Sequence, residues 1–406
     1  MHVLFVEPAF PRNQRQFVRG LRTAGARVTG IGERPLAEID PELSHWLYRY
    51  ERVSSVCDER ALLHAVRRCQ AREAVDRLEA TVEAHILPAA RVREACSIPG
   101  TSVETAFLCR DKPTMKQALR EAGIPCAEST AASSAEEARA FAARVGFPIF
   151  LKPRDAAGSA GTCRVDSFRD LDQVLALERF DRGASIAVEE FVEGHEGFFD
   201  TLSVDGEVVH EFVSHYYPNV LEAMRTRWIS PQFITTNRLD SPGYAELRAL
   251  GRKVIARLGI GTSATHMEWF FGPKGLRFSE IGCRPPGVLT WDLYCAANEM
   301  DVYAEWATLL VRGRPSQTPS RRYSAGLIAL RPDRDGAIAG YSGLEEAERA
   351  LGEWVIDSHF PPPGTPTQGV EAGYMANAWI RVRHPDYDRL GSMLDSVGRT
   401  VKVHAA

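Results

Sequence analysis

THMEWFFGPKGLRFSEIGCR, at residues 265–284, is the stretch that decides the fold. Two apolar segments flank a turn at residues 272–275, so the stretch is predicted to form a β-hairpin. In that hairpin Glu268 and Glu280 can lie side by side on adjacent strands. Two close carboxylates need a cation, and Mg²⁺ is commonly bound by one or two carboxylates together with nucleotide phosphates. The hairpin therefore predicts a magnesium site at these two acids.

The same hairpin carries two candidate catalytic residues. Alternation with a period of two places His266 on the same strand face as Glu268. Arg284 follows Glu280 by four residues, and its guanidinium could bind a transferring phosphoryl group or a substrate carboxylate through two hydrogen bonds. The alternative is a solvated acidic hairpin, but the apolar residues of the second strand indicate burial on one side.

A second candidate site begins where a short apolar strand ends at Lys152. The loop behind it, residues 154–162, is rich in small residues and includes Gly158, Ser159 and Gly161. Glycines let backbone N–H groups approach anionic oxygens, and a lysine can neutralise the charge of α and β phosphates. The segment therefore predicts a phosphate-binding loop that closes over the nucleotide; an ordinary flexible surface loop is the alternative.

A third candidate site is the acidic segment EEFVEGHE, residues 189–196, which joins two predicted lobes. Main-chain groups of an extended linker can pair with an adenine edge, apolar side chains can flank the ring, and a carboxylate can accept ribose hydroxyls. An exposed acidic turn is the alternative. The candidate nucleotide residues of this segment are Glu189, Glu190, Phe191, Val192 and Glu196.

Lysine is scarce in this chain. Of 49 basic residues only six are lysines, at positions 112, 116, 152, 253, 274 and 402. The chain thus carries most of its positive charge as guanidinium, which differs chemically from a compact ammonium point charge. A lysine inside a candidate site is therefore more informative here than in an average protein.

The pattern of strands and helices predicts four units. Residues 1–110 alternate strand and helix, which favours a parallel α/β sheet, although the first turn lacks a GxGxxG motif. Residues 111–188 and 189–315 are predicted as two α+β lobes, the second rich in antiparallel strands. Residues 316–406 are predicted as a small C-terminal α/β domain.

Taken together these motifs resemble the ATP-grasp superfamily over roughly residues 1–320. Five landmarks occur in the expected order. They are Gly100 to Ala106 (GTSVETA), Arg110 to Lys112 (RDK), Phe150 to Pro153 (FLKP) with its glycine loop, Glu189 to Val192 (EEFV) with Gly194 and Glu196, and Glu268 with Glu280 to Arg284 (EIGCR).

The resemblance implies an ATP-grasp fold of two α+β lobes, preceded by a Rossmann-like α/β domain and followed by a small C-terminal α/β domain. It implies ATP and Mg²⁺ as cofactors, with two ions expected and Mn²⁺ as the alternative ion. It also implies phosphate contacts for Lys112 and Lys152, adenine contacts for residues 189–192, a ribose contact for Glu196, and metal coordination by Glu268 and Glu280.

Within the superfamily the strand ATHME, residues 264–268, is similar to that of L-amino acid ligases. The resemblance implies an ATP-dependent carboxylate–amine ligase that forms an amide or peptide bond through an acyl phosphate. One departure is Gly282, where many relatives have an asparagine that coordinates metal, so a water would replace that ligand. Beyond Arg284, a loop at residues 285–287 with Trp291 and Tyr294 is expected to shape the acceptor side.

Two other functions stay open on the sequence. A biotin carboxylase-like or purine-pathway ATP-grasp enzyme would use bicarbonate or a nucleotide intermediate with the same core motifs. An inactive nucleotide-binding regulator would have lost an acid, a lysine or the arginine, and none of these is lost.

The composition limits which classes of binding partner we expect. The chain has 406 residues with a net charge of -4 and no run of basic residues, which excludes nucleic acid as an expected partner. Eight cysteines without a CxxC pair indicate reduced thiols, and no apolar stretch of membrane-spanning length occurs. We therefore expect a cytoplasmic enzyme for small-molecule carboxylates and amines, amino acids among them, with the N-terminal domain as a candidate face for a homodimer.

Overall fold

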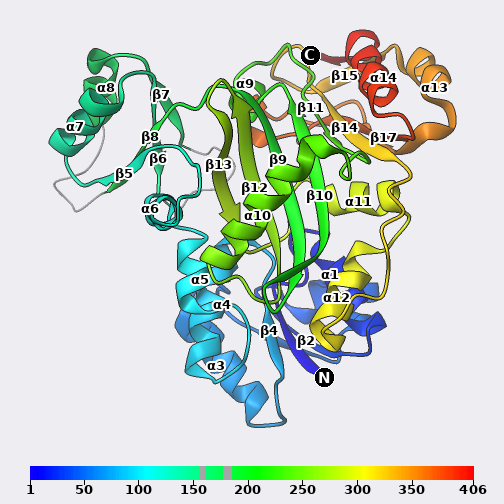
Figure 1. Ribbon diagram of the computed structural model, residues 1–406. Coiled ribbons are helices and arrows are strands. Elements are labelled where there is room, and N and C mark those ends of the chain that lie inside the picture. The colour runs from blue at the N-terminus through cyan, green and yellow to red at the C-terminus, as the bar shows by residue number, and fades with distance from the viewer. Residues whose placement is uncertain (155–160, 177–184) are drawn as a thin grey trace.

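The N-terminal part of the chain folds as a parallel α/β layer. The computed structural model describes residues 1–154, 161–176 and 185–406. Four parallel strands, in the order β3-β2-β1-β4 within the described chain, lie at the foot of Figure 1. The predicted parallel sheet is confirmed. Its elements are β1 (His2–Val6), α1 (Gln14–Thr23), β2 (Arg27–Gly32), α2 (Pro41–Trp46), β3 (Arg49–Arg52), α3 (Glu59–Gln70), β4 (Arg77–Glu79), α4 (Glu83–Ala95) and α5 (Val103–Leu108).

The next lobe projects away from the rest of the molecule at the upper left of Figure 1. Its described strands form an antiparallel sheet in the order β5-β8-β6-β7, and α7 and α8 pack together beside it. Ser134 and Ser167 cap these two helices by accepting the backbone N–H groups of Glu137 and Asp170. The elements are α6 (Lys112–Glu121), β5 (Ser129–Ala132), α7 (Ala135–Val145), β6 (Ile149–Pro153), β7 (Cys163–Val165), α8 (Phe168–Leu175) and β8 (Ile186–Glu190).

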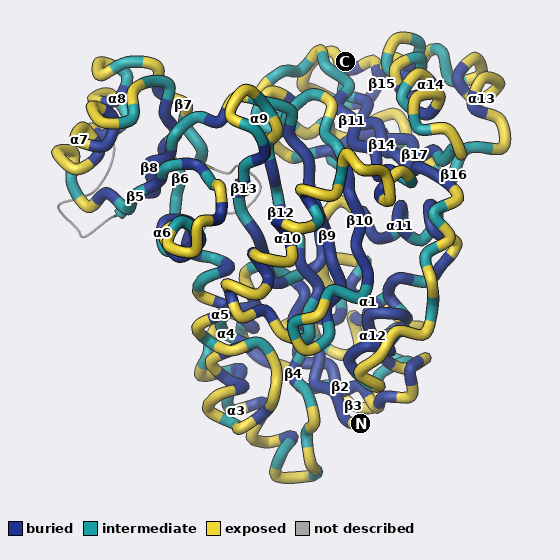
Figure 2. The backbone as a smooth tube through the Cα atoms, in the orientation of Figure 1, coloured by how far each residue is buried: buried dark blue, intermediate teal, exposed yellow. Residues whose placement is uncertain are grey.

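A large antiparallel sheet forms the centre of the molecule. In the described ranges it has eight strands in the order β13-β12-β9-β10-β11-β14-β17-β16. Phe198 and Phe199 on β9 join different apolar clusters, one with α11 and α12 and one with α10, so the sheet is covered on both faces (Figure 2). The elements are β9 (His195–Val204), β10 (Glu207–Tyr217), α9 (Val220–Ala223), β11 (Gln232–Thr235), α10 (Ala245–Arg257), β12 (Ser263–Gly272), β13 (Gly275–Gly282), α11 (Thr290–Asn298) and α12 (Val302–Arg312).

Within the described residues, the C-terminal segment contributes three strands to the large sheet and also forms a two-stranded sheet of its own, β15-β18. Every residue of β14 is buried, and β14 pairs with β11 on one side and β17 on the other. The large sheet therefore runs through the predicted boundary near residue 315, because a fully apolar strand needs neighbours on both edges and cover on both faces. The elements are β14 (Ser324–Leu330), β15 (Ile338–Ser342), α13 (Leu344–Leu351), β16 (Val355–His359), β17 (Ala378–His384), α14 (Tyr387–Thr400) and β18 (Lys402–Ala405).

Aromatic packing fixes the N-terminal layer against the central sheet. The Phe17 ring on α1 lies 5.0 to 5.1 Å from the rings of Trp291, Tyr303 and Trp306 on α11 and α12. A Cβ at Gly20 would lie 2.5 Å from the carbonyl oxygen of Tyr303, so glycine permits this close approach of α1 and α12. The N-terminal layer is thus a rigid base for the residues that it contributes to the site.

Candidate active site

One cleft between the projecting lobe and the hairpin β12–β13 at one end of the large sheet brings together most of the predicted nucleotide and metal residues. We call it the interlobe cleft. Its lining includes Lys112, Lys116, Phe150, Lys152, Glu189, Glu190, Phe191, Val192, Glu196, Asn219, Glu268 and Glu280. These residues come from five separate segments of the sequence, so only the fold assembles them.

Two lysines bind one buried carboxylate at the floor of the cleft. Lys116 Nζ and Lys152 Nζ each lie 2.8 Å from an oxygen of Glu189, whose side chain is 2% exposed. Burial favours the neutral acid, but the two ammonium groups outweigh it and hold the pKa of Glu189 at about 2. Burial lowers the pKa of Lys116, whereas Glu189 and other acids raise that of Lys152 despite its burial.

The sequence predicted a nucleotide contact for Glu189, and the structure adds side-chain contacts with two lysines. Its side chain orients two lysines, and its strand β8 contributes to the floor of the cleft. Lys116 was not predicted as a site residue. The available signal was its place one helical turn after Lys112 on α6, in a chain with six lysines.

The two predicted metal-binding acids are direct partners across the hairpin. Glu268 on β12 pairs in register with Glu280 on β13, beside a bulge after Glu268. Burial and then the charge of Glu280 raise the pKa of Glu268, whereas Lys112 and the cleft lysines overcome burial and lower the pKa of Glu280. Lys112 Nζ lies 3.4 Å from Glu280. Of the two acids, Glu268 is the one whose negative charge is less compensated by nearby cations.

The carboxylate pair fits a magnesium ion. No group of three or more histidine, cysteine or acidic side chains suited to a metal occurs among the described residues. Mg²⁺ does not need one, because it retains waters and takes its remaining oxygens from substrate phosphates. A cation at Glu268 would also offset the desolvation and the repulsion by Glu280 that together raise the pKa of this acid.

The segment predicted to contact adenine brings an aromatic side chain to the cleft. The rings of Phe150 and Phe191 meet edge to face at 5.6 Å, and the guanidinium of Arg164 lies over Phe191. The backbone N–H of Phe191 already donates to the carbonyl of Pro148, and Lys274 pairs with Glu190. Apolar side chains that could flank an adenine ring are therefore present. The main-chain N–H of Phe191, however, is already hydrogen-bonded within the projecting lobe.

The predicted ribose residue Glu196 lies at the start of β9. Its side chain accepts the backbone N–H of Val220 at 2.7 Å, and Asn219 accepts its backbone N–H at 3.1 Å. Burial raises the pKa of Glu196, and the Val220 hydrogen bond and the charge of Lys152 oppose this rise. A hydroxyl donor would suit this poorly compensated carboxylate.

The two predicted catalytic residues lie beside the cleft and outside its lining. His266 Nδ1 is 2.7 Å from Asp200, which also accepts the hydroxyl of Tyr294 at 2.5 Å. Although burial disfavours the charged ring, Asp200 raises the pKa of His266. His266 Nε2 lies 3.9 Å from Glu268, so a buried chain leads from Tyr294 to the carboxylate pair.

Arg284 is held by an acid from the N-terminal layer. Its Nε donates to Glu83 at 2.7 Å, and Arg110 donates to the same residue. A Cβ at Gly282 would lie 3.0 Å from Glu83 Oε2. Glycine at position 282 therefore leaves room for the Glu83 carboxylate where a larger residue would crowd it.

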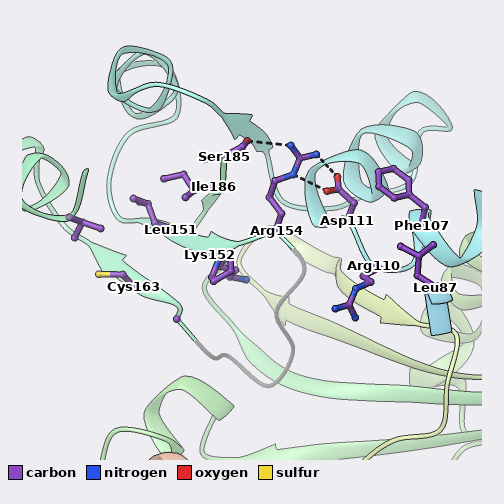
Figure 3. A pocket seen from close by; sticks show the side chains of 13 residues that line it. Leu87, Phe107, Arg110, Asp111, Leu151, Lys152, Arg154, Cys163, Ser185 and Ile186 are labelled. Carbon is purple, nitrogen blue, oxygen red and sulfur yellow. Dashed lines mark hydrogen bonds and ion pairs between the residues drawn. The ribbon is translucent and has the colours of Figure 1, made fainter. Parts of the chain in front are cut away.

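Lys152 also lines a second cavity, which has a volume of about 550 Å³ (Figure 3). Arg154 reaches across it to Asp111, with nitrogen to oxygen distances of 2.8 and 2.9 Å, and to Ser185. Gly161 borders this cavity, whereas the predicted phosphate-loop residues Gly158 and Ser159 lie outside the described residues. The hydrogen bonds of Asp111 to Arg154 and Thr114 fix the first turn of α6, which carries Lys112.

The two aromatic residues expected at the acceptor side belong to the core. Trp291 is 3% exposed and Tyr294 is 0% exposed. Tyr294 stacks on Phe212 at 4.3 Å, and its hydroxyl is bound to Asp200. The Tyr294 hydroxyl therefore contacts Asp200, which in turn contacts His266. Asp200, which the sequence analysis did not single out, had one visible signal: it is an acid inside the otherwise apolar run FFDTL.

Comparisons with known proteins show which families this chain resembles. Residues 111–196 match the family described as carbamoyl-phosphate synthase L chain, ATP binding domain. The chain is 27% identical over 319 residues to an L-arginine-specific L-amino acid ligase of Bacillus subtilis, covering 77% of this chain and 76% of that protein. It is 25% identical over 213 residues to alanine–anticapsin ligase of Bacillus subtilis strain 168, covering 48% of this chain and 44% of that protein.

A solved structure shows the same fold. The crystal structure of L-amino acid ligase from Bacillus licheniformis superposes with a TM-score of 0.77 at 16% identity, covering 100% of this chain and 98% of that one. Separately, none of the helices in the described ranges combines the length and apolar character needed to cross a membrane.

Proposed function

Because this chain belongs to the ATP-grasp superfamily, as its motifs predicted, we propose that it is an ATP-dependent carboxylate–amine ligase that acts on amino acids. One observation carries the proposal: the interlobe cleft gathers lysines and a carboxylate pair, the groups that phosphoryl transfer from MgATP requires. The named L-amino acid ligase relatives support amino acids as the substrate class.

In this proposal a substrate carboxylate oxygen attacks the γ-phosphorus of ATP, and ADP leaves. The resulting acyl phosphate is attacked by an amine, which loses a proton as phosphate departs and the amide forms. Lys112 and Lys152 neutralise phosphate charge in this scheme, and Arg284 binds an anionic oxygen of the substrate. Magnesium held by Glu268 and Glu280 would neutralise negative charge on the phosphate oxygens.

The half-buried position of the carboxylate pair, whose side chains are 21% and 27% exposed, supports catalysis by positioning and electrostatics. Charges act more strongly in a site that excludes water, and exclusion of water also protects an acyl phosphate from hydrolysis. Two bound magnesium ions, use of Mn²⁺, a cytoplasmic location and a homodimer are further predictions from the sequence that accompany this proposal.

The test is a screen for stimulated ADP release. Single amino acids, pairs of amino acids, dipeptides, polyamines and bicarbonate are added separately to purified protein with MgATP. We expect amino acids to stimulate ADP release and a peptide product to appear by mass spectrometry. Stimulation by bicarbonate with no amino acid would favour a carboxylase-type reaction instead.

A matched variant makes the screen specific for the proposed site. We expect E280Q to fold with an unchanged circular dichroism spectrum and to lose most of the stimulated ADP release, because it removes one carboxylate of the pair. E128Q, which changes an exposed acid that pairs with Arg144, serves as the control and should keep full turnover. Full turnover in E280Q would make the metal assignment wrong.

A further inference from the structure

Two buried cysteines from distant parts of the chain meet beside the candidate active site. Cys109 Sγ lies 2.9 Å from Cys283 Sγ, although 174 positions separate them in the sequence. Both are free thiols, and the residues are 4% and 5% exposed. A disulfide has a sulfur–sulfur distance of about 2.05 Å, so the two atoms need to approach by only about 0.9 Å.

The position of the pair links it to the site. Cys109 follows the last residue of α5 and lies two residues before Asp111, the N-cap of α6. Cys283 follows the last residue of β13 and lies next to Arg284. A bond between them would tie the start of the projecting lobe to the hairpin that carries the carboxylate pair. No other two cysteines of the described chain are within hydrogen-bonding distance of each other.

The surroundings give the two sulfurs different roles. Burial lowers the pKa of Arg93, whereas the neighbouring Glu79 and Cys283 raise it. Arg93 thus places a positive charge near the Cys283 sulfur, while Glu83 places a negative charge near Cys109. The contact with Cys283 and burial both raise the pKa of Cys109, which retains its proton. Cys283 is thus the better first nucleophile and Cys109 the partner that follows.

We propose that Cys109 and Cys283 form an oxidation site that a hydroperoxide converts into a reversible disulfide. The Cys283 thiolate attacks the hydroperoxide, breaks its O–O bond and becomes a sulfenic acid. The Cys109 sulfur then forms the S–S bond as its proton leaves with the sulfenic hydroxyl as water. The two sulfurs lose two electrons, which the peroxide bond accepts, and a thiol reductant restores both cysteines.

The disulfide is expected to reduce turnover, a consequence that rests on the proposed ligase function. The disulfide would constrain the residue next to Arg284, whose guanidinium Glu83 holds at 2.7 Å, and we expect that constraint to displace Arg284. A misplacement of about 1 Å at an active site can lower the rate about 100-fold. We therefore expect the oxidised protein to lose at least about tenfold in amino-acid-stimulated ADP release.

The test treats the reduced full-length protein with hydrogen peroxide, blocks remaining thiols by alkylation and maps peptides by mass spectrometry. We expect a peptide pair linked through Cys109 and Cys283, with a mass lower by two hydrogens and sensitive to dithiothreitol. Turnover should fall as this pair forms and recover with dithiothreitol. No linked pair in the wild-type protein, or a linked pair with unchanged turnover, would overturn the proposal.

Cysteine variants distinguish oxidation of this pair from oxidation of other residues. C283S leaves Cys109 without its partner and should keep its turnover in peroxide, and C109S should give no linked pair; C57S, which alters an exposed cysteine, should behave like the wild type. If C283S does not fold, C283A replaces it. Peroxide inactivation of C283S as deep as that of the wild type would assign the loss to other residues. The linked peptide is read without activity, so a failure of the ligase proposal leaves this test intact.

Discussion

Replacing Glu189 with glutamine is the most informative perturbation of the nucleotide site. The substitution keeps the shape of the side chain but removes the negative charge that two lysines share at 2.8 Å. Lys116 is 2% exposed and would keep an uncompensated charge in the core. Removing one partner of a buried ion pair typically costs about 3–5 kcal/mol, which corresponds to a fall in Tm of roughly 4–6 °C if all 406 residues unfold as one unit.

The assay is thermal unfolding with and without saturating MgATP. We expect ligand-free E189Q to melt below the wild type, and the difference to narrow with MgATP, because phosphates supply negative charge to Lys152, one of the two lysines that lose their partner. Glu128, whose side chain pairs with Arg144 at the surface, provides the control. E128Q should change stability by no more than about 1 kcal/mol. Equal melting of E189Q and the wild type without ligand would refute the reasoning.

The pH dependence gives an independent check. The pKa of Glu189 is lowered from 4.5 to about 2, so its contribution to stability is present above pH 4.5 and is lost as the pH falls toward 2. The wild type should therefore lose more stability over this window than E189Q. Parallel curves for the two proteins would show that Glu189 is not held as an ion by its lysines.

Three further substitutions test the catalytic side of the site. E268Q should raise the Tm of the ligand-free protein at pH 8, because it removes a half-buried charge that Glu280 repels, yet lower turnover at least about 100-fold; a lower Tm would contradict the charge argument. E83Q should raise the KM for the substrate carboxylate more than that for ATP, since Arg284 loses the acid that holds it; equal changes in both KM values would count against this role. D200N should lower the pKa of His266 measured by NMR titration, because the carboxylate that raises it is gone; an unchanged pKa would reject that pairing.

Local motifs predicted the parts of the site that lie close together in the sequence. The pairing of Glu268 with Glu280 followed from a single hairpin, because its short turn fixes which residues face each other. The parallel N-terminal sheet and the antiparallel strands of the second lobe followed in the same way from alternation. These features need no knowledge of how distant segments meet.

Contacts between distant segments could not be predicted. Glu83 reaches Arg284 across 201 positions, and nothing in the sequence near Glu83 indicates that contact. The ion pairs of Glu189 went unpredicted for the same reason, since its lysine partners lie on α6 and β6. The C-terminal strands likewise needed the fold, because a buried apolar strand such as β14 does not reveal which sheet it joins.

Transfer of a carboxylate oxygen to phosphate tests the central proposal most directly. The protein is incubated with MgATP, an amine and an amino acid that stimulates ADP release, its carboxylate labelled with ¹⁸O. An acyl phosphate intermediate requires the C–O bond of that carboxylate to break when the amine attacks, so one ¹⁸O atom should appear in each inorganic phosphate released. Phosphate that is free of ¹⁸O while peptide accumulates would contradict ligation through an acyl phosphate.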